Sequence, residues 1–301
     1  MTLQQLQALV AVVDAGGIRA AAKHLHLSQA AVTKSMRLLE AEAGVPLLVR
    51  RSRGVDLTEA GQRLLARARL VGRQVELARE ELGQASGDDC GSVRVGVTPF
   101  LALTVLGDAF RWFRERYRNV AVELSEGLMS RALPRLRDGT LDIAVVAADV
   151  GELHDAAFNT RRILQARQRI AVRTGHPVLA AATAHALADL EWVLTHPGAE
   201  AAYPDLTTMF MRAGAEAPRR VVVCDTLAAL ALLRSSDAVG VVPEPLLGHP
   251  ETRGIVAIDD CPLVPSDIEL LLLSRPDVPL TPAAAYFAHC LAEVSRNARA
   301  A

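Results

Sequence analysis

The sequence of 301 residues predicts an α/β protein with a helical N-terminal part and a C-terminal part in which strands and helices alternate. Apolar residues recur at helical spacing from Leu3 to Leu39, and a longer helix with heptad spacing follows Thr58. Short apolar runs typical of buried strands begin at Val93. A chain of this length has room for two or three domains, each with its own core.

The composition excludes several classes of protein. Half of the residues are apolar and about a fifth are charged, as in ordinary soluble globular proteins. The longest apolar runs are too short to span a bilayer, and Met1–Val13 lacks the early cation and the cleavage site of a signal peptide. We therefore expect a cytoplasmic protein with no membrane partner. The cysteines show no CxxC spacing, which argues against a metal site: Cys90, Cys224, Cys261 and Cys290.

The N-terminal segment predicts three short helices joined by tight turns. The first carries the apolar stripe of Leu3–Val13, and the second spans Arg19–His26. Ser28 is a good N-cap for the third helix, which stops at Gly44. Its apolar residues at i, i+4 and i+7 form an inward face: Val32, Met36 and Leu39.

The opposite face of the third helix is polar and basic, at Gln29, Thr33, Lys34 and Arg37. Residues 15–55 hold seven cations and two anions, whereas the balance is acidic from residue 88 onward. This asymmetry is expected when one domain meets phosphate, although a solvated face would show the same charges. A helix, a tight turn and such an amphipathic helix can dock in the major groove of double-stranded DNA.

Two further features follow the third helix. Arg50 to Val55 resemble a wing between short β-type runs, and Thr58 is the expected N-cap of a long helix. A second copy of the chain is the expected partner for its heptad seam, although an ordinary amphipathic helix would show similar spacing. Polar residues at Gln84–Asp89 predict a hinge. The seam consists of Leu64, Ala68, Val71, Val75, Ala78 and Leu82.

Strands and helices alternate in the rest of the chain, which predicts parallel sheets with right-handed crossovers. Leu101–Arg116 predicts one helix, and Ser130–Arg137 another. The predicted strands are Val93–Val97, Val120–Leu124, Leu141–Ala147, Arg169–Val172, Trp192–Thr195, Arg220–Val223, Val239–Val242 and Ile268–Leu273.

One dense run of residues has a known order and spacing: Ala20–Thr33, Leu38-Leu39-Glu40, Gly44, Leu47, Arg50, Arg53, Leu57-Thr58 and Ala60-Gly61. In these positions the chain resembles the LysR-type transcriptional regulator family. The resemblance implies a winged helix-turn-helix over 1–57, a linker helix and hinge over 58–87 that dimerises, and an effector-binding domain over 88–301. That domain would resemble a periplasmic binding protein, with lobe one at about 92–163 and 267–301 and lobe two at about 164–266.

The resemblance also implies the partners. It predicts a homodimer through 58–87, usually within a homotetramer, that binds a DNA operator and a small-molecule effector. RNA polymerase is a further candidate partner, and no cofactor, metal or catalytic residue is expected.

The DNA-binding roles follow from side-chain chemistry. Gln29 suits a bidentate contact with adenine, and Thr33 suits a thymine methyl group or a phosphate. Lys34 and Arg37 are expected on phosphates, and Arg53 in the flanking minor groove.

Three other positions in this region have open roles. Arg50 would equally well be a structural residue of the wing, and Ser28 is as readily an N-cap as a phosphate contact. Ala30 stands where the family often has proline, at the DNA-facing start of the helix, so we expect the operator preference to differ from that of relatives.

The effector site is predicted from fold logic, because ligands of β/α sheets bind beyond the carboxyl ends of strands, at helix N-termini. We expect a small organic anion there, such as an aromatic carboxylate or sulfonate. Phe100 would as readily belong to the core, His196 would as readily be an isolated histidine, and Cys224 a small buried apolar residue. The predicted site comprises Thr98, Pro99, Phe100, Gly127 and Met129 in lobe one, and His196, Pro197, Asp225 and Thr226 in lobe two.

Three other functions fit the residues less well. An enzyme is disfavoured because the chain has no Gly-rich phosphate loop, HExxH or GxSxG, and a catalytic Cys224 would need exposure and a lowered pKa. A thiol-based redox sensor would need two cysteines close together, and Cys224 and Cys261 lie 37 positions apart. A constitutive DNA-binding protein without an effector is the remaining alternative.

Overall fold

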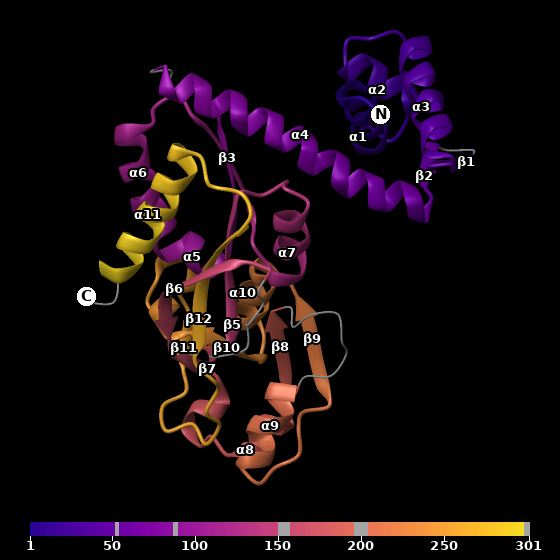
Figure 1. Cartoon of the computed structure of the whole chain (residues 1–301). Helices are drawn as coiled ribbons and strands as arrows, with labels where there is room; N and C mark the ends of the chain where they lie inside the picture. The colour runs from indigo at the N-terminus through magenta and orange to yellow at the C-terminus, as the bar shows by residue number, and fades with distance from the viewer. Residues whose placement is uncertain (52–53, 87–89, 150–156, 196–203, 298–301) are drawn as a thin grey trace. The chain divides into compact units, whose positions relative to one another are not determined.

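The computed structural model describes residues 1–51, 54–86, 90–149, 157–195 and 204–297 (Figure 1). The chain divides into two compact units, Met1–Ser92 with Pro134–Leu141, and Val93–Leu133 with the residues from Asp142 onward. The first contains a helix-turn-helix and a long helix, and the second contains two five-stranded sheets. The predicted α/β class, with a helical N-terminal part and a two-lobed C-terminal part, is confirmed.

The helix-turn-helix consists of α1 (Leu3–Asp14), α2 (Ile18–His24) and α3 (Gln29–Ala43). Thr2 begins α1 with a capping box, in which its hydroxyl accepts from the Gln5 amide. The inward faces of the three helices form one apolar core, as their spacing predicts. Its most deeply buried members include Leu9, Val12, Ala21, Val32 and Leu39.

The predicted wing is present as an antiparallel hairpin of β1 (Leu48–Arg51) and β2 (Gly54–Leu57). The Glu40 carboxylate holds its start, since one oxygen accepts from the amides of Leu47 at 2.8 Å and Leu48 at 3.1 Å. Gly61 lies so close to the same segment that a Cβ there would sit 2.1 Å from the Leu47 carbonyl oxygen. The wing therefore has a fixed attachment to both flanking helices.

Helix α4 (Glu59–Ala85) begins at the predicted N-cap, because the Thr58 hydroxyl accepts from the Gly61 amide at 3.0 Å. Within one chain its predicted heptad seam is half uncovered. Ala68 is buried and Leu64 and Val75 are half-buried, whereas three seam residues are exposed: Val71, Ala78 and Leu82. Leu82 has 73% of its surface exposed.

A buried ion cluster lies near the end of α4. The Arg73 guanidinium, with a side chain only 2% exposed, lies 3.2 Å from a Glu80 carboxylate oxygen and donates to the Ser92 hydroxyl and carbonyl. The same Glu80 oxygen accepts from the amide and hydroxyl of Ser92. Ser92 is therefore tied to α4 through its amide, its hydroxyl and its carbonyl.

The first sheet has the order β4–β3–β5–β12–β6 and the second β11–β7–β10–β8–β9. Strands β3 and β5 are parallel, as are β10, β8 and β9, whereas β12 and β7 run antiparallel to their neighbours. The first sheet contains β3 (Ser92–Val97), β4 (Ala121–Glu126), β5 (Ile143–Asp149), β6 (Asn159–Ala166) and β12 (Ile268–Ser274). The second contains β7 (Gln168–Arg173), β8 (Glu191–Thr195), β9 (Arg220–Cys224), β10 (Val239–Pro243) and β11 (Ile255–Ala257).

Two connections join the sheets. The chain passes from β6 to β7 at Arg167 and returns between β11 and β12. Strand β6 belongs to the first sheet and extends to Ala166, three residues beyond the end of lobe one that was expected near residue 163. The helices around the sheets are α5 (Pro99–Thr104), α6 (Leu106–Arg116), α7 (Met129–Arg137), α8 (Ala184–Ala188), α9 (Pro204–Arg212), α10 (Thr226–Ser235) and α11 (Pro282–Asn297).

The single helix predicted over Leu101–Arg116 was wrong. Thr98 caps a short helix that already begins at Pro99, and the backbone departs from helical geometry at Val105, with φ −116°. Val105 is fully buried in an apolar cluster that contains residues of both sheets, and we attribute the break to this packing. No helix in the described part of the chain combines the length and apolar content needed to cross a membrane.

Candidate nucleic-acid interface and effector site

Helix α3 exposes its outer face to solvent. The Ser28 hydroxyl accepts from the Ala31 amide at 3.1 Å, which supports the N-cap role, and Gly44 ends the helix at φ 68°. The inward residues are at most 3% exposed: Val32, Met36 and Leu39. The side chains opposite them face solvent because the core fixes the rotation of the helix.

The structure brings the predicted base and phosphate contacts together on this face. Gln29, Ala30, Lys34 and Arg37 are exposed, and in the described part of the chain the long polar side chains among them have no hydrogen-bond or ion-pair partner. Thr33 is half-buried, and its hydroxyl donates to the Gln29 carbonyl at 2.8 Å. That hydroxyl keeps only its acceptor capacity, so its methyl group is the freer feature.

The wing residues are described less fully. The backbone of Arg50 pairs with Val55 in the hairpin, while its side chain and the whole of Arg53 lie outside the described residues. Their predicted roles in the wing and minor groove stay predictions.

In lobe one the predicted effector residues surround the end of β3. Thr98 is 4% exposed, and its hydroxyl caps α5 by accepting from the Leu101 amide at 3.3 Å. Phe100 is buried in an apolar cluster that contains residues of both sheets, which favours the structural alternative for this ring. Gly127 donates to the Val97 carbonyl at 2.7 Å and leaves no room for a side chain, since a Cβ would lie 2.7 Å from the Val97 amide nitrogen. Met129, half-buried, begins α7.

In lobe two the strands β8 and β9 end side by side, with Thr195 opposite Cys224. Asp225 is exposed at the N-cap position of α10 but makes no capping bond, and Thr226 is half-buried in the first turn. His196 and Pro197 lie outside the described residues. Sequence logic therefore places Asp225 and Thr226 correctly at a strand-to-helix junction.

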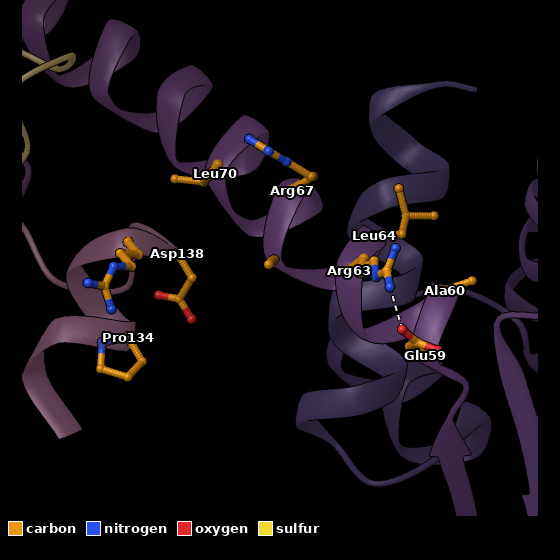
Figure 2. A pocket seen from close by; sticks show the side chains of 10 residues that line it. Glu59, Ala60, Arg63, Leu64, Arg67, Leu70, Pro134 and Asp138 are labelled. Carbon is orange, nitrogen blue, oxygen red and sulfur yellow. Dashed lines mark hydrogen bonds and ion pairs between the residues drawn. The ribbon is translucent and has the colours of Figure 1, made fainter. Parts of the chain in front are cut away.

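Two pockets lie elsewhere. One of about 1090 Å³ is lined by residues of α4 between Glu59 and Leu70 and by Pro134, Arg137 and Asp138 (Figure 2). The other, of about 510 Å³, lies along Leu247–Asp259. Neither contains a residue of the predicted effector site.

Three of the four thiols lie in surroundings that favour the protonated form, whereas Cys90 is exposed. Burial raises the pKa of Cys224 and of Cys261, and raises that of Cys290 to about 11. These thiols are protonated near neutral pH, and the thiolate is the reactive form. No metal-binding cluster of His, Cys, Asp or Glu occurs among the residues that the structure describes.

Sequence reasoning assigns no role to Glu40 or Gly61, although both belong to the motif. The structure shows why these residue types stand there, because Glu40 holds the start of the wing and only glycine fits beside the Leu47 carbonyl. A sequence does not show which backbone amides a carboxylate contacts, so the role of Glu40 could not be predicted from it.

Comparison with known proteins gives a consistent result. Residues 3–62 match the bacterial regulatory helix-turn-helix protein model of the lysR family, and residues 86–296 match the LysR substrate binding domain. The HTH-type transcriptional regulator TdcA of Escherichia coli (strain K12) is 28% identical, over 80% of this chain and 76% of its own. The regulator ClcR of Pseudomonas putida is 30% identical, over 81% of this chain and 83% of its own.

Solved structures agree. The LysR family transcriptional regulator CbnR is 25% identical and superposes with a TM-score of 0.67, over 98% of this chain and 99% of that one. Full-length CbnR bound to its target DNA matches with a TM-score of 0.66, over 98% of this chain and 100% of that one. With a helix-turn-helix and a LysR substrate-binding domain that both match, this chain belongs to the LysR family of DNA-binding transcription regulators.

Proposed function

We propose that the outer face of α3 recognises the operator of this regulator. Gln29 contacts a base edge, Thr33 presents its methyl group, and Lys34 and Arg37 hold phosphates. The observation that supports this is the exposure of these polar side chains on a helix whose rotation the buried core fixes. The relative CbnR was solved with its target DNA.

The phosphate role of Lys34 can be tested with DNA duplexes that the parent protein selects from a random-sequence pool. Lys34→Ala should weaken binding to every duplex alike and make the salt dependence less steep, by about 0.9 in the logarithmic slope per lost contact. Arg63→Ala is the matched control, because Arg63 is an exposed cation of the same unit that pairs with Glu59. A Lys34→Ala protein with the parent's affinity and salt slope would contradict the assignment.

We propose further that α4 forms a homodimer through residues 58–87, and that two dimers form a tetramer. The support is the apolar seam that the single chain leaves exposed at Val71, Ala78 and Leu82. A two-fold dimer would place two α3 helices on the half-sites of a pseudo-palindrome. Val71→Glu should raise the dimer dissociation constant in sedimentation equilibrium, and an unchanged constant would contradict this interface.

We propose that the C-terminal domain binds a small organic anion between its lobes and thereby modulates operator binding. The support is the position of Thr98 and Thr226 at strand-to-helix junctions, where amides and the helix dipole favour negative charge. Thr98 directly follows β3 and caps α5, and Thr226 is the first residue of α10, separated from β9 by Asp225. The exposed carboxylate of Asp225 beside α10 favours a ligand that also offers a hydrogen-bond donor.

A thermal-shift screen of organic acids, with operator binding followed in parallel, separates this regulator from a constitutive DNA-binding protein. The strongest hit is then titrated by calorimetry against Thr226→Ala, Thr98→Ala and Thr98→Ser. Thr98→Ser is the control, because serine keeps the α5 cap. Unchanged affinity in both alanine variants would move the site elsewhere, and a screen without hits would favour the constitutive alternative.

A further inference from the structure

The turn between α2 and α3 has a conformation that normally requires glycine. Helix α2 ends in a Schellman motif, in which the His26 amide donates to the Lys23 carbonyl at 3.3 Å and the Leu27 amide to the Ala22 carbonyl at 2.9 Å. The motif needs a left-handed residue at its centre, and His26 has φ 53°. Glycine is favoured there because a Cβ clashes with the backbone.

The other two helices of the helix-turn-helix, α1 and α3, end at glycine. Gly16 follows α1 with φ 73°, and Gly44 follows α3 with φ 68°. Among the described residues, the non-glycine residues with positive φ are His26 and Asp260. Histidine is tolerated in this region, but at a free-energy cost that glycine would avoid. The left-handed residue that is not glycine, His26, therefore lies in the turn that leads directly into α3.

Nothing in the described part of the chain offsets this cost. The residue is exposed, and its imidazole has no hydrogen bond, ion pair or ring contact there. His26 lies two residues before Ser28, the N-cap of α3, at the rim of the proposed DNA-binding surface. In either neutral tautomer an imidazole offers one N–H donor, and turns that flank a recognition helix commonly contact the DNA backbone.

We propose that His26 donates a hydrogen bond from its imidazole to a phosphate oxygen next to the bases that α3 contacts. This inference rests on the proposed role of α3. A side chain with a donor at this position adds a contact that glycine cannot make, which accounts for the strained turn. The contact fixes the position of α3 in the groove and carries no base specificity of its own.

The test uses the full chain and duplexes selected from a random pool by the parent protein. His26→Gly should bind about tenfold more weakly to a duplex with two half-sites, that is about threefold per half-site, from the loss of one hydrogen bond in each. Asp260→Gly is the matched control, since it relieves the same backbone conformation in a turn of the second lobe. It should leave DNA affinity unchanged.

Duplexes with single methylphosphonate substitutions locate the contact. Neutralising one flanking phosphate should weaken the parent protein and leave His26→Gly unaffected at that position. The α3 amides of His26→Gly should exchange hydrogen at least as slowly as those of the parent. Parent-like affinity, equal sensitivity of both proteins at every phosphate, or faster exchange in α3 would each overturn the proposal, the last because it would show a merely structural role.

Discussion

The proposed DNA-binding surface and the predicted effector site differ in how the chain assembles them. The first comes from one helix, so residues 28–37 are placed together by helical geometry once the core fixes its rotation. The second draws on residues as far apart as Thr98 and Thr226, which two separate sheets must position. A local sequence pattern is therefore enough to predict which residues share the DNA-binding surface. The effector site can be predicted only from the positions that ligands occupy in other proteins of this fold.

The largest effect is expected at the junction where α4 ends. Arg73→Ala leaves the nearly buried Glu80 carboxylate without its cation and should destabilise the protein by about 3–5 kcal/mol. Urea unfolding and amide exchange at Ser92 measure the loss. Arg63→Ala, whose ion pair with Glu59 is exposed, should change stability by less than about 1 kcal/mol. If both variants unfolded at the same urea concentration as the parent, the Arg73–Glu80 cluster would not contribute to the stability of the protein.

The DNA-binding unit and the effector-binding domain can be compared by changing one glycine to alanine in each. A Cβ at Gly61 would lie 2.1 Å from a backbone oxygen, and one at Gly127 within 2.9 Å of three backbone atoms. Each change to alanine should therefore cost about 1–3 kcal/mol, Gly61→Ala with loss of operator affinity and Gly127→Ala with loss of structure around β3. Hydrogen exchange in the full chain would localise both effects.

Gly107 provides the control for that pair. It lies exposed in α6, and a Cβ there would meet nothing within 4 Å. Gly107→Ala should stabilise α6 by about 0.5–1 kcal/mol, because alanine is the better helix former. Equal destabilisation by all three variants would show that close backbone approach is not the cause.

The smallest effect is expected at Cys224. Burial and the neighbouring Asp225 raise the pKa of this thiol, so it stays protonated and unreactive near neutral pH. Cys224→Ser and peroxide treatment of the parent should both leave operator binding unchanged in anisotropy titrations. A peroxide response abolished by Cys224→Ser would revive the redox-sensor alternative.

The sequence predicts much of the N-terminal unit because its signals are local. Ser28 and Thr58 are N-caps as expected, and the apolar spacing of α3 matches its buried face. The predicted helix over Leu101–Arg116 is divided at Val105, and we attribute the break to burial of this residue in an apolar cluster of both sheets. The left-handed backbone of His26 is also not predicted, because histidine does not indicate a positive φ as glycine does.

The most direct test of the account is the base preference of Gln29→Ala. Duplexes from a random pool are selected with the parent and with the variant, and bound sequences are compared position by position. We predict that one position in each half-site loses its preference, at a cost of about 1–3 kcal/mol, while the other positions keep theirs. An unchanged preference at every position would contradict recognition of the operator by the outer face of α3.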